Sequence, residues 1–310
     1  MRILVTNDDG IEAPGLRTLV QALSDEGMQP WVAAPDSERS ATGHGITILR
    51  PLTVRPAQVP GAVEAYAVDG RPADTTMLAL SVPDFFASST EGGFDLVLSG
   101  INRGNNTGLH VIYSGTVAGA REAACKGVPA LALSLDHHSR DAEYSASAAA
   151  ILPLVRTLSR RPDLLCSLAS TVVNVNVPHC ALADMAGYSL DGQSVECTKP
   201  GFKPVAVDGE GVRAWMNSAA AGTVLDRRPG FDAASTNSRL VSLCVLTLTS
   251  HAPLSHGAVD IDASQLPKGV SDAAAEAALE MAARLALASG AAQTASLIRG
   301  EAAAPAEASL

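Results

Sequence analysis

The sequence has little positive charge, few cysteines and no long apolar run, and each shortage argues against a class of protein. Its 310 residues include 22 Lys or Arg against 32 Asp or Glu, a net charge of −10, which disfavours a general nucleic-acid-binding surface. The five cysteines are scattered, without CxxC pairs or zinc-ligand spacing, so we expect buried free thiols in a reducing compartment. No apolar run approaches the roughly 20 residues that cross a bilayer. We therefore expect a cytoplasmic protein that binds neither a membrane nor a nucleic-acid polymer.

Several familiar phosphate-handling patterns are also missing. There is no GxxxxGK[ST] loop, and no GxGxxG motif follows a strand and opens a helix. The adjacent Asp8 and Asp9 lack the DxDxT spacing of haloacid-dehalogenase-like phosphatases. Response-regulator receivers need an acid after their third strand and a lysine after their fifth, which residues 98–100 and 135–137 do not supply.

What the first half does contain is an alternation of β-like runs and helical patterns. Helices are expected from Pro14 to a stop at Gly27, over residues 114–126 and over residues 145–160. The β-like runs cover residues 3–5, 31–34, 94–98, 131–135 and 172–177. Strands that alternate with helices indicate an α/β, Rossmann-like fold whose mostly parallel sheet is covered by helices on both faces.

The rest of the chain departs from this alternation. Residues 46–54 and 63–68 are expected to form a hairpin excursion, and residues 240–249 an arm or hairpin strand. A terminal helix is expected with Ser271 as its N-cap and with Leu279, Ala283 and Leu287 on one face. We divide the chain into a catalytic core (1–178), a β-rich arm region that completes the domain (179–265), a C-terminal helix (271–289) and a disordered tail (290–310).

Four polar clusters directly follow β-like runs or open a helix after one. They cover residues 7–10, 34–43, 99–108 and 113–120. Parallel sheets bind their ligands at the carboxyl ends of the strands, so we expect the four clusters to meet at one edge.

The donors in these clusters indicate a hard metal ion. Asp8, Asp9, Ser40 and Asn102 offer only oxygen ligands, which favour Mg²⁺, Mn²⁺ or Ca²⁺ over zinc or copper. Two adjacent carboxylates repel each other, and a divalent cation would relieve that repulsion. We expect one such cation per subunit.

A phosphate is expected beside that cation. Ser114, Gly115 and Thr116 fall at a helix N-terminus, where free backbone N–H groups and the helix dipole favour an anion. A divalent cation next to a phosphate indicates phosphoryl chemistry, because the metal can polarise the P–O bond and lower the pKa of a bound water.

Each cluster also has a plain structural explanation. Asp8 and Asp9 could cap a solvated turn, Ser40 could be a loop hydroxyl, and Asn102 could occupy a glycine-rich turn. The segment at Ser114 could be an ordinary helix start, and Asp74 a helix cap. We expect His137 and His138 to lie in a solvated loop. The occurrence of four clusters at consecutive strand ends favours a site over these separate explanations.

The motifs closely resemble those of the SurE family, the survival protein E nucleotidases, in order and spacing. They are "ILVTNDDGIEAPG", "VAAPDSERSATG", "LVLSGINRGNNTG", "VIYSGTVAGAREA" and "VPALALSL". The resemblance implies a Rossmann-like, metal-dependent phosphomonoesterase that acts on nucleoside 5′- and 3′-monophosphates. It places the divalent-metal ligands on Asp8, Asp9, Ser40 and Asn102, and the phosphate pocket on Asn106 and residues 114–116.

In that picture Asp8, Asp9 and Asn102 are the catalytic residues, and Asp9 orients or deprotonates the nucleophilic water. The family's arms imply a homodimer or a homotetramer. The second half departs from the family pattern, since Asp232 is retained but Phe231 and Leu240 replace a threonine and an aromatic residue. Two alternatives therefore stay open: a phosphatase for a phosphorylated small metabolite in a dedicated biosynthetic pathway, and a non-catalytic nucleotide or phosphate binder.

Overall fold

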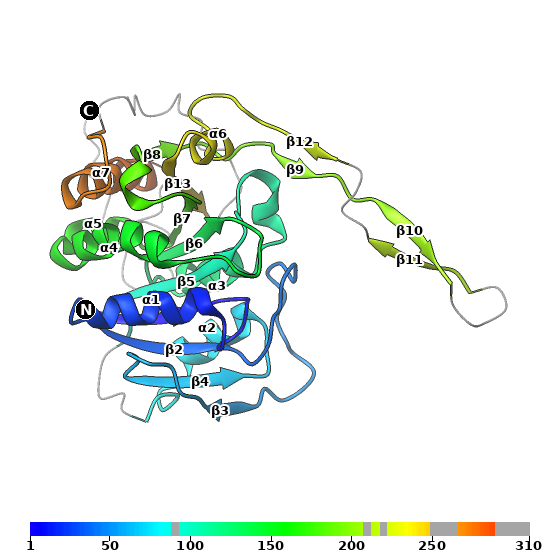
Figure 1. Cartoon of the computed structure of the whole chain (residues 1–310). Helices are drawn as coiled ribbons and strands as arrows, with labels where there is room; N and C mark the ends of the chain where they lie inside the picture. The colour runs from blue at the N-terminus through cyan, green and yellow to red at the C-terminus, as the bar shows by residue number, and fades with distance from the viewer. Residues whose placement is uncertain (88–92, 207–211, 218–221, 249–265, 289–310) are drawn as a thin grey trace, which may run out of the picture.

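A nine-stranded sheet forms the centre of the protein. The computed structural model describes residues 1–87, 93–206, 212–217, 222–248 and 266–288 (Figure 1). The strand order is β3-β4-β2-β1-β5-β6-β7-β13-β8, and neighbours from β4 to β7 are parallel. These strands are β1 (Arg2–Thr6), β2 (Gln29–Pro35), β4 (Glu64–Val68), β5 (Leu96–Arg103), β6 (Ala130–Asp136) and β7 (Thr171–Pro178). The predicted α/β fold with a mostly parallel sheet is confirmed.

Helices cover both faces of this sheet. Side chains alternate along a strand, so Ile3 and Val5 of β1 face one layer while Leu4 faces the other. The layer on Ile3 contains α1 (Pro14–Asp25), α4 (Ser145–Arg160), α5 (Pro162–Ser167) and α7 (Asp272–Ala288). The layer on Leu4 contains α2 (Pro72–Ser81) and α3 (Gly115–Cys125). The two cores are therefore built from alternate residues of the same strands.

The expectation of an arm or hairpin strand at residues 240–249 is wrong for its described part. β13 (Leu240–Thr247) lies inside the main sheet, antiparallel to β7 and parallel to β8 (Gly187–Asp191). Its side chains are buried on both faces, Val241 and Leu243 in one core and Cys244 in the other. A long apolar run fits a strand covered on both sides, whatever the direction of its neighbours.

The projecting arm is instead formed by four short strands in the described parts of the chain between residues 197 and 224. Two short antiparallel pairs extend away from the main sheet (Figure 1). They are β9 (Cys197–Thr198) with β12 (Thr223–Val224), and β10 (Phe202–Val205) with β11 (Ala214–Asn217).

The expected hairpin near residue 50 is only partly formed. β3 (Val54–Pro56) pairs antiparallel with β4, but β4 also pairs parallel with β2 and so belongs to the main sheet. Residues 46–53 form no strand, because side chains of α2 and of its N-cap residue bind the backbone there. Asp74 accepts from Thr47 N at 2.7 Å, and Arg71 donates to Ile46 O at 3.1 Å.

The terminal helix α7 begins as predicted. The Ser271 hydroxyl accepts a hydrogen bond from the Ala274 N–H at 3.2 Å, the geometry of an N-cap. Leu279 and Ala283 are buried, but Leu287 is half exposed and does not continue their face. Residues 289–310, including the expected tail, lie outside the described residues.

Smaller elements complete the chain: α6 (Asp232–Asn237) and the 3₁₀ turns η1 (Gly108–Ile112) and η2 (Leu182–Asp184). All five cysteines are free thiols, but only Cys244 is buried, so the expectation of buried thiols is wrong for the other four. Within the described residues, none of the helices has the length and apolar character that crossing a membrane requires.

Candidate active site

A tight turn presents Asp8 and Asp9 at the carboxyl end of β1. The Asn7 side chain closes this turn, since its Nδ2 donates to Gly10 O at 2.8 Å and its Oδ1 accepts from Gly10 N at 3.2 Å. Gly10 has φ +98°, a conformation that favours glycine. The residues around the acid pair therefore fix the backbone that carries it.

Asp8 is buried against the start of α3. Its side chain is held by the Thr116 hydroxyl, which donates to Oδ1 at 2.5 Å. Gly115 allows this approach, because a Cβ at that position would lie 2.7 Å from Asp8 Cβ. The structure thus places one carboxylate directly beside the helix start that the sequence predicts as a phosphate site.

Asp9 is half-buried and faces a bulge in β5. Its Oδ2 accepts from the Arg103 N–H at 3.0 Å. The pairing of β5 with β6 shifts between Ser99 and Asn102, and Gly100 at φ +145° sits so close that a Cβ would lie 2.3 Å from Leu133 O. Bulges re-aim strand residues, and this one brings the Arg103 N–H, next to Asn102 in the chain, to Asp9.

Asn102 lies in this bulge and is 9% exposed. Its Nδ2 donates to Gly104 O at 2.8 Å, so the amide offers its oxygen to a ligand. Ser40 is placed differently. Its segment lies beside Asp8, because Arg39 N donates to Asp8 O at 2.7 Å, but the Ser40 side chain is exposed and its hydroxyl donates to Glu38 at 2.9 Å.

Burial makes the two carboxylates costly to ionise. The pKa of Asp8 is raised to about 7, mainly by desolvation; the Thr116 hydrogen bond opposes this rise and repulsion from Asp9 adds to it. Desolvation also raises the pKa of Asp9, against the lowering effect of Arg103, and Glu38 adds to the rise. Such a pair is stabilised by a nearby cation.

The donor set fits a hard cation. Asp8, Asp9 and Asn102 supply carboxylate and amide oxygens, the ligands that Mg²⁺ and Mn²⁺ accept. Nowhere in the described part of the chain do three or more His, Cys, Asp or Glu side chains gather in a way that could hold a metal. A site here therefore combines two carboxylates with neutral oxygen donors.

The start of α3 has the features of an anion site and of an ordinary cap. Ser114 is the N-cap residue, and its Oγ accepts from Val117 N at 3.1 Å. The N–H groups of Gly115 and Thr116 have no partner within the helix. The Thr116 N–H is directed to the Asp8 carboxylate, and the N–H of Gly115 can bind a ligand.

Asn106 is buried behind this helix start rather than free in a pocket. Its Nδ2 donates to Ser134 Oγ at 2.8 Å and to Thr116 Oγ1 at 3.4 Å. Its backbone is held by two amides of β7: Asn176 Oδ1 accepts from Asn106 N at 2.7 Å, and Asn174 Nδ2 donates to Asn106 O at 2.8 Å. Asn106 is thus positioned to orient Thr116.

Sequence reasoning missed several of these partners. Asn174 and Asn176 carry a signal, since two amides two residues apart in a buried apolar strand point to one face and need hydrogen-bond partners there. Glu38 and Arg103 carry no comparable signal, because their contacts depend on the bulge in β5 and the loop after β2.

Asp232 ties the region beyond residue 190 to the site. This buried carboxylate accepts from Gly108 N and from Ser194 N, both at 3.0 Å. The chain that leads into the arm is thereby fastened to η1, the turn that precedes α3.

His137 and His138 lie in the loop after β6, as expected; His137 stacks on His179 with ring centroids 3.8 Å apart.

We predict that Gly15→Ala disturbs this site from a distance. A Cβ at Gly15 would lie 2.0 Å from Ile101 O, so α1 must move away from the bulge that carries Asn102. Overpacking of this kind costs roughly 1–3 kcal/mol of unfolding free energy, measurable by urea denaturation, and we expect phosphate release to fall with it. Gly93→Ala is the control, because a Cβ at Gly93 would meet nothing within 4 Å. Equal stability of the two variants would contradict the prediction.

These observations define a Rossmann-like α/β protein with an acidic, oxygen-rich site beside a helix N-terminus. Residues 3–200 match the model of the family described as Survival protein SurE, and the chain belongs to that family.

Named relatives agree with this assignment. The chain is 48% identical over 179 residues to 5′-nucleotidase SurE of Desulforudis audaxviator, covering 57% of this chain and 66% of the relative. It is 41% identical over 198 residues to 5′-nucleotidase SurE of Nostoc sp., covering 63% and 70%. The crystal structure of the SurE protein from Aquifex aeolicus superimposes with a TM-score of 0.63 at 27% identity, over 81% of this chain and 96% of that one.

Proposed function

We propose that this protein is a phosphoric monoester hydrolase that releases phosphate from nucleoside 5′- and 3′-monophosphates in the cytoplasm, with one Mg²⁺ or Mn²⁺ per subunit. The observation that carries the proposal is the buried Asp8, which is held by Thr116 at the start of α3 and adjoins Asp9. The relatives named 5′-nucleotidase SurE support the substrate class.

The residues divide the work by position. Asp8, Asp9, Asn102 and Ser40 would hold the cation, Ser40 after its hydroxyl turns from Glu38. When bound, the cation supplies positive charge that offsets the carboxylates and the phosphate. The N–H groups at the start of α3, with Ser114 and Thr116, bind the phosphate, and Asn106 keeps Thr116 in place.

We assign Asp9 as the group that orients or deprotonates the attacking water. Among the described residues Arg103 N donates to its Oδ2, so Oδ1 remains for the water. We expect Asp9→Asn to lower phosphate release about 100-fold or more while some Mn²⁺ binding remains, measured by titration calorimetry. Full activity of this variant with metal bound would disprove the assignment.

The function is tested by phosphate release from nucleoside monophosphates, sugar phosphates and p-nitrophenyl phosphate, with and without each divalent metal. We expect metal-dependent release that is fastest with a nucleotide. Release from none of these compounds would instead favour a non-catalytic nucleotide or phosphate binder.

A second candidate keeps the chemistry and changes the substrate to a phosphorylated small metabolite in a biosynthetic pathway. The family match ends at residue 200, before most of the arm and before β13. In the same panel, poor turnover of nucleotides with strong turnover of another phosphoester would favour it.

We further propose that the protein is a homodimer or homotetramer joined through the arm. Phe202, Trp215 and Met216 on this arm are each about 60% exposed, and such apolar groups are normally covered by a partner. Light scattering after size-exclusion chromatography tests this, with a monomer at micromolar concentration as the contradicting result.

A further inference from the structure

A groove with arginine and aliphatic walls lies beside the candidate active site. It has a volume of about 510 Å³ and is formed by the loop after β2 and by the segment that leads into α2. Among the described residues no Asp or Glu lines it, although the whole chain carries a net charge of −10. The walls include Arg39, Arg50, Arg71, Ile46, Ile48 and Leu49.

This groove is connected to the site through its loop. Arg39 lines the groove, and its backbone N–H donates to Asp8 O at 2.7 Å. Four residues on, Gly43 N donates to Tyr113 O at 3.0 Å, which places the loop against the residue before the N-cap of α3. The loop that lines the groove is thus hydrogen-bonded both to the turn of the acid pair and to the residue before the N-cap of α3.

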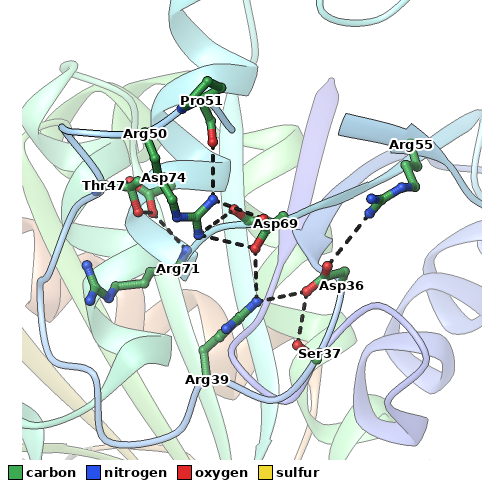
Figure 2. A network of polar contacts seen from close by, with 10 residues as sticks. All are labelled: Asp36, Ser37, Arg39, Thr47, Arg50, Pro51, Arg55, Asp69, Arg71 and Asp74. Carbon is green, nitrogen blue, oxygen red and sulfur yellow. Dashed lines mark hydrogen bonds and ion pairs between the residues drawn. The ribbon is translucent and has the colours of Figure 1, made fainter. Parts of the chain in front are cut away.

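The charge of Arg71 is the uncompensated one. Arg50 pairs with Asp69 at 2.9 Å, and Arg39 pairs with Asp36 at 2.9 Å. The guanidinium of Arg71 donates to the backbone oxygen of Ile46, and within the described ranges it forms no ion pair (Figure 2). It is therefore the cation of this groove that remains for an anionic ligand.

The position of Arg71 is fixed before any ligand arrives. Asp74 is fully buried and accepts from Thr47 N at 2.7 Å, from Thr47 Oγ1 at 2.8 Å and from Arg71 N at 2.8 Å. The arginine side chain also passes Gly45, where a Cβ would lie 3.3 Å from its Cδ. A pre-positioned guanidinium loses less conformational entropy when it binds phosphate.

The rim of the groove is apolar. Ile48 and Leu49 are 80% and 98% exposed, beside the guanidinium groups. An anion alone would gain nothing from these side chains, whereas an organic group that carries an anion would contact both.

We propose that this groove is the leaving-group subsite of the hydrolase and that Arg71 selects substrates with a second phosphate on the leaving group, such as a nucleoside bisphosphate. The inference rests on the proposed function and names its substrate class. Adenosine 3′,5′-bisphosphate is the matching probe, because whichever ester is cut, the leaving group keeps one phosphate.

The test is the ratio of kcat/KM for adenosine 3′,5′-bisphosphate to that for AMP. Arg71→Gln removes the charge, and we expect the ratio to fall about tenfold, the loss of one charge-assisted contact. Arg71→Lys should restore part of it. Arg55→Gln is the matched control, because Arg55 belongs to the same network (Arg55 Nη1 to Asp36, 3.9 Å) but does not line the groove.

An unchanged ratio in Arg71→Gln, or an equal fall in Arg55→Gln, overturns the proposal. The ratio is insensitive to a partly unfolded preparation, since both substrates meet the same active fraction. If the wild type hydrolyses neither substrate, the proposed hydrolase function is contradicted, independently of the proposal for the groove. Calorimetric titration with adenosine 3′,5′-bisphosphate then decides the groove: tenfold weaker binding to Arg71→Gln supports it, and equal binding overturns it.

Discussion

Replacing Asp8 with asparagine is expected to lower metal-dependent phosphate release at least about a thousandfold. The carboxylate is buried at the junction of the acid pair and the start of α3, so it can act on both the cation and the phosphate. Loss of one such electrostatic contact costs roughly 4 kcal/mol of transition-state stabilisation, or about three powers of ten in rate. The measurement is kcat/KM for AMP at saturating Mn²⁺.

The control for this variant is Asp141→Asn. Asp141 is an exposed carboxylate in the loop after β6, hydrogen-bonded to Ser139, and its replacement should leave release unchanged. If Asp8→Asn kept more than a tenth of wild-type activity, Asp8 could not have the role proposed for it.

The same Asp8→Asn substitution is expected to stabilise the metal-free protein at high pH. The folded pKa of Asp8, about 7, lies above its ordinary value of 3.8, so between these values the folded state holds a proton that the unfolded state has lost. Stability of the wild type therefore falls as pH rises through this window, by an upper limit of about 4 kcal/mol. Asparagine has no proton to lose, so the difference between variant and wild type should grow from pH 4 to pH 8.

Urea denaturation in the presence of a chelator measures this difference at each pH. Added Mg²⁺ should reduce it, because a cation favours the charged carboxylate in the wild type and has less to bind in the variant. A difference that stays constant from pH 4 to pH 8 would contradict the burial cost assigned to Asp8.

Much of the fold follows from local patterns in the chain. Buried parallel strands read as short apolar runs, and Leu16, Leu19 and Leu23 mark the inner face of α1 at helical spacing. The same alternation places Asp8, Asn102 and Ser114 at strand ends or at a helix start on one edge of the sheet. Those positions depend on short stretches of sequence, and for that reason they could be predicted.

Other features depend on contacts between distant residues and could not be predicted. β13 reads as an arm strand until its neighbours β7 and β8 are known, since pattern alone does not say what covers a strand. The acid pair suggests a solvated turn, yet α3 covers Asp8 because Gly115 permits contact. The groove at Arg71 depends on Asp74, which holds Thr47, a loop residue 27 positions earlier in the chain. A contact of this kind leaves no periodic pattern in the sequence.

The metal dependence of the site is measured by phosphate release from AMP by the metal-depleted protein, before and after addition of Mn²⁺ or Mg²⁺. We expect no release above background in chelator, recovery when either cation is supplied, and no recovery in Asp8→Asn. Release that continues unchanged in chelator, or that Asp8→Asn retains with metal, would contradict a cation-dependent site built on the acid pair.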